Sequence, residues 1–131
     1  MKVYGHFIDG QMITSDANKT FASLNPTNQR VLAYFQSGTK KDLEKAIDAA
    51  EKALPLWSSL PAPRRGELLL DVAQVLRKNK EKLGKLVSTE MGKILPEGLG
   101  DVQEAIDVFE YMAGEGRRLF GHTTPSELRN K

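Results

Sequence analysis

The sequence predicts an α+β fold, mainly α, in which an N-terminal β-hairpin and short strands precede about four helices. Turn residues separate short apolar runs over residues 1–38, which favours strands. Over residues 39–121 the apolar positions recur three and four residues apart, as on one face of a helix. Residues 122–131 are polar and predict a tail. The 131 residues suffice for one domain with a modest core, so we expect a single unit over 1–131.

The β-rich region contains three candidate β segments. An Asp-Gly pair at 9–10 lies between two short apolar runs within residues 6–12, which is a strong hairpin signal. Residues 20–24 alternate in polarity and end at an Asn-Pro turn, and residues 31–35 form a third β-leaning run. Short strands bury little area, so this region is expected to rely on the helices that follow.

The first predicted helix begins after Thr39. Thr39 is a good N-cap residue, and Asp42 stands three positions later, where a carboxylate completes a capping box. Pro55 is expected to end or bend this helix. Trp57 follows, and we predict that it is a buried core residue rather than a ligand platform, since large aromatics mostly serve as buried area.

Three more helices are predicted downstream. The second follows the proline-rich residues 60–63 and closes near Asn79, and the third runs from Lys80 to Met91. Gly92 can adopt the left-handed conformation that ends a helix. The fourth is expected over about 96–119, weakened near its end by two glycines.

Composition excludes several classes of function. The formal net charge is +2, from 19 basic and 17 acidic residues that are interspersed, so no nucleic-acid partner is expected. No apolar run approaches the ~20 residues that cross a bilayer, and the N-terminus lacks a signal-peptide core, so we expect no membrane partner and a cytoplasmic location. The absence of cysteine rules out disulfides, thiolate metal sites and thiol catalysis in this chain.

Several motifs, in order and with their spacing, resemble the aldehyde dehydrogenase superfamily over nearly the whole chain. Residues 89–104 closely resemble its Glu-x-Gly-Lys segment, with Glu90 as the glutamate. Within this segment, residues 91–104 are similar to the semialdehyde-oxidising branches. Residues 24–28 resemble its Asn-Pro-x-Thr-Gly turn, although Asn28 replaces the usual glycine. Residues 111–121 resemble the end of the family's next helix.

The resemblance implies NAD(P)-dependent oxidation of an aldehyde or semialdehyde to a carboxylate through a cysteine thiolate. The family's nucleophilic cysteine, general base, oxyanion asparagine and cofactor motif have no counterpart in this sequence. We therefore assign no catalytic and no cofactor-binding residue, and NAD or NADP is implied only for a full-length enzyme. The chain is interpreted as an N-terminal fragment, or a truncated relative, that is inactive alone. Its expected partners are the missing catalytic portion or a second copy. The alternative is a stand-alone helical interaction module derived from such an enzyme.

One metal site is implied by the same resemblance. In some family members an acidic residue at the position of Glu90 helps to hold a monovalent cation, with backbone carbonyls that correspond to Ser23 and Leu24. Hard cations bind carboxylate and carbonyl oxygens. The competing interpretation is that Glu90 is an exposed side chain near a helix end.

Overall fold

The structure is a computed structural model and describes residues 2–17, 19–118 and 120–121. The predicted tail, 122–131, lies outside the described residues. Short strands precede four α-helices, which confirms the α+β, mainly α fold class. The strands are β1 (Val3–Tyr4), β2 (His6–Ile8), β3 (Gln11–Ile13), β4 (Thr20–Leu24) and β5 (Val31–Gln36). The helices are α1 (Lys40–Ser59), α2 (Ala62–Lys78), α3 (Lys80–Met91), α4 (Leu95–Ala113) and the 3₁₀ turn η1 (Glu115–Arg117).

The β region contains the predicted hairpin and a second small sheet. β2 and β3 pair antiparallel, and their turn places Asp9 at φ 52° and Gly10 at φ 74°, the positive values that a type I′ turn requires. The other sheet has the order β1-β5-β4, with β1 parallel and β4 antiparallel to β5. The sequence did not predict β1, because two residues are too short a run to carry a periodicity.

Helix α1 begins as the sequence predicts but continues further. The Thr39 hydroxyl accepts a hydrogen bond from the Asp42 N–H at 3.2 Å, and the Asp42 carboxylate accepts one from the Thr39 N–H at 2.9 Å, which is a complete capping box. The expectation that Pro55 ends the helix is wrong, since α1 continues to Ser59. Proline removes one backbone donor, and the helix here has only one further turn, in which the Ser59 hydroxyl bonds the Leu56 carbonyl.

Helices α2, α3 and α4 form a close-packed unit. α4 packs along both α2 and α3, around the buried side chains of Ala73, Val102 and Ile106. A Cβ atom added at Gly98 would lie 2.5 Å from the carbonyl oxygen of Gly84, so only glycine allows α3 and α4 to approach this closely. Gly92 ends α3 at φ 76°, as predicted.

The predicted end of α4 requires a correction. The helix stops at Ala113 rather than near residue 119, and η1 follows. Gly114 and Gly116 weaken the helix here, and Gly116 lies against the backbone of Ala62, where a Cβ atom would meet the carbonyl oxygen at 2.5 Å. The chain therefore tightens into a 3₁₀ turn that packs on α2.

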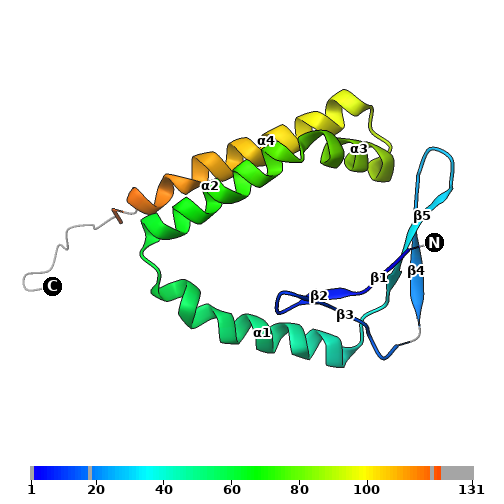
Figure 1. The fold of residues 1–131 in the computed structure, drawn as a ribbon, viewed down its shortest axis with the longest axis horizontal. Helices are drawn as coiled ribbons and strands as arrows, with labels where there is room; N and C mark the ends of the chain where they lie inside the picture. Colours follow the sequence, from blue (N-terminus) through cyan, green and yellow to red (C-terminus); the bar gives the residue numbers. More distant parts are fainter. Residues whose placement is uncertain (1, 18, 119, 122–131) are drawn as a thin grey trace, which may run out of the picture.

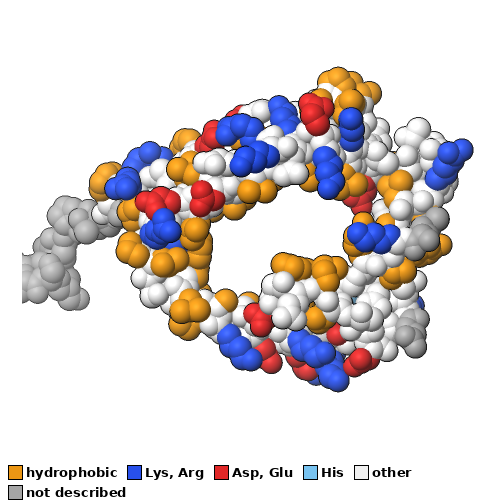
Figure 2. Space-filling model, viewed as in Figure 1, with side chains coloured by type: hydrophobic (Ala, Val, Ile, Leu, Met, Phe, Trp, Pro, Cys, Tyr) orange, Lys and Arg blue, Asp and Glu red, His pale blue; other side chains and the backbone are white. Residues whose placement is uncertain are grey.

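The elements are arranged as an open ring (Figure 1). We call residues 62–117 the helical arm and residues 2–59, except the undescribed 18, the β–α1 arm. The arms are joined in sequence at Leu60 and Pro61, and α3 approaches the β4–β5 sheet on the far side of the ring. Figure 2 shows hydrophobic side chains bordering much of the central opening.

Candidate interface and cation site

The side of α1 that carries its apolar stripe is uncovered. Leu43, Ile47, Leu54 and Trp57 recur at helical spacing, and all four are exposed. The prediction that Trp57 is a core residue is wrong for this chain, because its exposed fraction is 44%. The reason lies in the packing: α1 contacts β2, but it makes no comparable packing with α2, α3 or α4 within the described residues.

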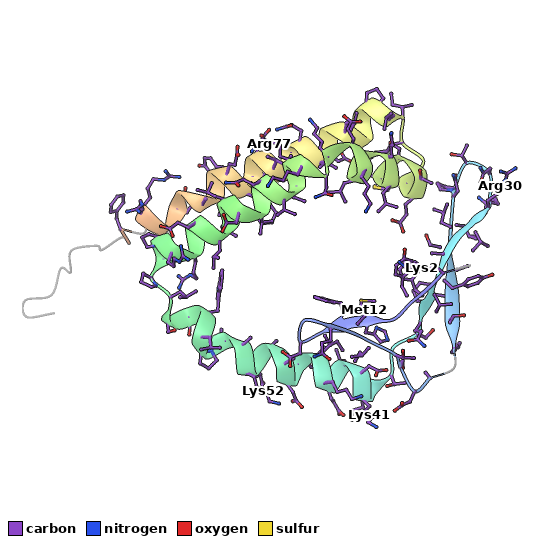
Figure 3. The ribbon with its side chains drawn as sticks, in the orientation of Figure 1. Lys2, Met12, Arg30, Lys41, Lys52 and Arg77 are labelled. Atoms are coloured by element: carbon purple, nitrogen blue, oxygen red, sulfur yellow. The ribbon has the colours of Figure 1, made fainter. Side chains whose placement is uncertain are left out.

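The hairpin and the helical arm add to this apolar surface. Phe7 is 71% exposed and Met12 is 58% exposed, although both are large hydrophobic residues of the β2–β3 hairpin. Figure 3 shows Met12 pointing into the central opening, whereas Lys41 and Lys52 point away from it. The helical arm exposes further apolar side chains, among them Leu70, Val72, Val75 and Leu86.

We give the name inner face to the exposed apolar stripe of α1 together with the exposed hydrophobic side chains of the β2–β3 hairpin. Its named members are Phe7, Met12, Leu43, Ile47, Leu54 and Trp57. Apolar surface of this extent, charged on the opposite side, is typical of a protein–protein interface. Such a surface can bury a partner segment, but it offers no group for acid–base or nucleophilic chemistry.

The residues of the predicted cation site come together in part. The Ser23 hydroxyl donates a hydrogen bond of 3.2 Å to the Glu90 carboxylate, which joins β4 to the end of α3 across 67 positions of sequence. Leu24, next to Ser23, is also exposed, and the β4–β5 register shifts between these two residues. The described residues contain no cluster of three or more acidic, histidine or cysteine side chains that could hold a metal ion. The cation site at Ser23, Leu24 and Glu90 stays a prediction.

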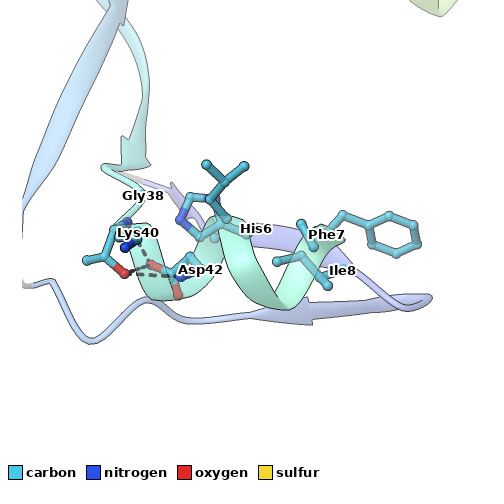
Figure 4. A pocket seen from close by; sticks show the side chains of 10 residues that line it. His6, Phe7, Ile8, Gly38, Lys40 and Asp42 are labelled. Carbon is cyan, nitrogen blue, oxygen red and sulfur yellow. Dashed lines mark hydrogen bonds between the residues drawn. The ribbon is translucent and has the colours of Figure 1, made fainter. Parts of the chain in front are cut away.

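The capping box at the start of α1 belongs to a buried polar cluster, and the sequence predicted the box but not the rest of the cluster. The Asp42 carboxylate accepts hydrogen bonds from the hydroxyls of Ser15, at 2.5 Å, and Thr39, at 2.7 Å. Figure 4 shows Asp42 beside the β2 residues His6, Phe7 and Ile8. The Ser15 hydroxyl, and then the Thr39 hydroxyl and N–H, hold the pKa of the Asp42 carboxyl well below its ordinary value. No local pattern indicates Ser15, which is 27 positions away.

A groove of about 720 Å³ lies beside this cluster and is lined by residues of β2 and α1. The His6 Nε2 atom is buried there, against Gly38, and has no hydrogen-bond partner among the described residues. The Asp42 carboxylate beside the groove is engaged by its capping box with Thr39 and by the Ser15 hydroxyl. The cluster therefore fixes α1 to the strands and leaves the inner face as the candidate functional surface.

Comparisons with known proteins agree on one family. The model of the aldehyde dehydrogenase family matches residues 12–131. Aldehyde dehydrogenase family 7 member A1 of Pisum sativum is 42% identical over 123 residues, which cover 94% of this chain and 24% of the pea protein. Alpha-aminoadipic semialdehyde dehydrogenase of Rattus norvegicus is 46% identical over 102 residues, or 78% of this chain and 19% of the rat protein. The crystal structure of lactaldehyde dehydrogenase from Escherichia coli has a TM-score of 0.90 at 32% identity and covers 98% of this chain and 27% of that chain.

Proposed function

We infer the function of this chain from one premise: it belongs to the aldehyde dehydrogenase family. The chain is an N-terminal fragment of that fold, and it spans 24% of the pea relative's length. We propose that the whole protein oxidises an aldehyde to a carboxylate with NAD or NADP. In that protein the chain would supply a scaffold, and its inner face would pack against the catalytic part. The observation that carries this proposal is the exposed apolar surface of α1 in a chain so much shorter than its relatives.

The chemistry would come from the remainder of the protein. This chain has no cysteine, so it cannot provide the thiolate that attacks the aldehyde. The N-termini of α1, α2 and α4 are also poor sites for a dinucleotide pyrophosphate, which binds free N–H groups. Asp42 takes part in the capping box of α1, and prolines without an N–H occupy the second positions of α2 and α4, Pro63 and Pro96. NAD is bound in a methylmalonate-semialdehyde dehydrogenase of Sinorhizobium meliloti that is 26% identical to this chain. We assign the cofactor to residues outside this chain.

We propose a semialdehyde as the substrate class. The support is the rat relative, whose name states that it acts on alpha-aminoadipic semialdehyde and which is 46% identical over 102 residues. The resemblance of residues 91–104 to the semialdehyde-oxidising branches supports the same substrate class.

Three further proposals concern the location of the protein, its oligomeric state and a structural cation. In the described residues no helix is long and apolar enough to cross a membrane, and we propose a cytoplasmic location. We propose that the whole enzyme is an oligomer. We also propose that Glu90, with the carbonyls of Ser23 and Leu24, holds a structural monovalent cation once the rest of the fold fixes these oxygens.

A chimera tests the proposed function. The corresponding N-terminal quarter of the pea relative is replaced by this chain, and NADH formation is followed with alpha-aminoadipic semialdehyde and with a panel of simple aldehydes. We expect turnover in the chimera and none in the chain alone. A matched variant, Ile47→Glu, places a charge on the inner face and should abolish assembly, whereas Lys52→Glu on the opposite side of α1 should not. A folded chimera that lacks activity would contradict the proposal.

The second candidate function is a stand-alone interaction module. The same uncovered inner face favours it, because a chain without its catalytic part would bind a second copy or another protein through these side chains. Sedimentation of the purified chain tests this second candidate. Concentration-dependent self-association that Ile47→Glu removes would support the module, and a clean monomer would count against it.

A further inference from the structure

Away from their covalent connection, the two arms of the ring are joined by two neighbouring contacts between the β4 region and the end of α3. The Ser23 hydroxyl donates to the Glu90 carboxylate at 3.2 Å, and both groups are on the surface. Beside this bond Gly92 lies against Pro26, so close that a Cβ atom on Gly92 would be 2.9 Å from the proline Cγ. We call these two contacts, Ser23–Glu90 and Pro26–Gly92, the clasp. Among the described residues no other side-chain hydrogen bond or ion pair crosses from β4 and β5 to the helical arm.

The contacts inside each arm are more extensive and more buried than the two contacts of the clasp. In the β–α1 arm, Asp42 binds Ser15 at 2.5 Å, and the Ser15 N–H binds the Gln36 side chain at 2.9 Å. This network ties α1 to β5 through buried or half-buried groups. In the helical arm, α4 packs along both α2 and α3 around the fully buried Ile106. An exposed hydrogen bond beside one van der Waals contact opens more readily than either of these interiors.

The connection opposite the clasp can act as a pivot. Leu60 has an extended backbone, with φ −68° and ψ 133°, directly after the last residue of α1. The Arg65 guanidinium donates to the Leu60 carbonyl at 2.7 Å, which fixes the connection to the start of α2. The Leu60 N–H donates to the Trp57 carbonyl at 3.3 Å, which fixes the other side of Leu60 to α1. Rotation is therefore concentrated at the φ and ψ angles of Leu60. A small change of the backbone angles at this connection displaces the β-sheet, at the opposite end of the ring, by a much larger distance.

We propose that the ring opens and closes by rotation about the backbone of Leu60, with the clasp as the contact that breaks. Opening makes the inner face accessible from the side of the sheet. This inference stands on contacts within the chain and does not depend on the proposed enzymatic function.

Spin-label distances test the motion directly, because a chain without cysteine takes labels only at introduced thiols. One pair, Arg30→Cys with Lys85→Cys, spans the clasp, and a control pair, Gln74→Cys with Lys85→Cys, lies within the helical arm. All three side chains are exposed. Electron–electron double resonance is recorded with excess unlabelled chain, so that distances between copies do not contribute. We expect a narrow distribution for the control pair and a broad one, with a long-distance population, for the clasp pair.

Variants then link the motion to the clasp. Glu90→Ala and, separately, Ser23→Ala should raise the long-distance population about two- to five-fold, the effect of losing one exposed hydrogen bond. Glu104→Ala, an exposed carboxylate in α4 outside the clasp, should leave the distribution unchanged. Circular dichroism confirms that each variant retains its helices. A clasp pair as narrow as the control pair would overturn the proposal, and so would a broad distribution that neither clasp variant changes.

Discussion

The two arms differ in how much of their apolar surface they bury within themselves. The helical arm buries part of its apolar surface in an interior of its own: α4 lies along α2 and α3, and Ala73 and Ile106 have no exposed surface. Other apolar side chains of this arm, such as Val75, remain exposed. The β–α1 arm has no such interior, since Leu43, Ile47 and Leu54 on α1 remain exposed and α1 contacts mainly the short strand β2. Burial of apolar side chains is the main source of folding free energy. The comparison therefore teaches that the helical arm is self-sufficient, whereas the β–α1 arm depends on a partner for much of its stability.

The largest expected effect is a cavity in the helical arm. Ile106→Ala should lower the free energy of unfolding by about 2–5 kcal/mol, because the side chain is completely buried between α2, α3 and α4. Val108→Ala, at an exposed position of the same helix, is the control and should change it by less than about 1 kcal/mol. Urea unfolding followed by circular dichroism measures both. Equal changes in the free energy of unfolding for the two variants would contradict the comparison, since they would mean that the helical arm has no specific core.

The second expected effect concerns the contact between α3 and α4. Gly98→Ala should destabilise the chain by about 1–3 kcal/mol, since the new Cβ would collide with the Gly84 carbonyl oxygen and the Ser88 hydroxyl. Gly100→Ala is the matched variant: it lies in the same helix with no atom within 4 Å of the new Cβ. It should stabilise the chain by about 0.5–1 kcal/mol, because alanine loses less backbone entropy in a helix. The same urea titrations decide whether the two changes have opposite signs.

The sequence predicted the features that depend on local chemistry. The hairpin turn at Asp9 and Gly10, the capping box of Thr39 and the left-handed end of α3 at Gly92 each follow from the preferences of adjacent residues. The family resemblance depended on motifs of the same local kind.

Features that join distant residues were not predictable in this way. Nothing near Ser15 indicates that its hydroxyl meets Asp42, and nothing near Trp57 indicates that its face of α1 is left uncovered. Periodicity identifies an apolar stripe, but it does not say which element covers that stripe. The proximity of Ser23 to Glu90 came from the resemblance, not from the residues.

The third prediction concerns the polar cluster that holds the β–α1 arm together. The pKa of the Asp42 carboxyl is lowered in the folded chain. Its ionisation therefore stabilises the fold at pH values above the ordinary aspartate pKa of about 3.9. That contribution is lost as the pH falls below this value toward the lowered pKa. Ser15→Ala removes the largest cause of the shift and should lower the urea midpoint at neutral pH.

The pH dependence distinguishes this effect from a lost contact. The difference in urea midpoint between the native chain and Ser15→Ala should be constant near neutral pH and should shrink as the pH falls below the ordinary carboxyl range. Ser58→Ala is the control, because the Ser58 hydroxyl bonds a backbone carbonyl rather than a carboxylate. Its difference from the native chain should not depend on pH. A Ser15→Ala difference that is equally independent of pH would show that the charge of Asp42 does not stabilise this arm.

The smallest expected effect is the most informative about the uncovered arm. In the chain alone, Trp57→Ala should change the free energy of unfolding by less than about 1 kcal/mol, since the side chain is 44% exposed and α1 lacks a helix partner. In a chimera that supplies the missing part, the same substitution should cost about 3–5 kcal/mol, as large-to-small changes at buried aromatic positions do. Unfolding of both proteins in urea, followed by circular dichroism, gives the two values. A large cost in the chain alone would mean that another segment already covers Trp57, and the distinction between a self-sufficient and a dependent arm would fail.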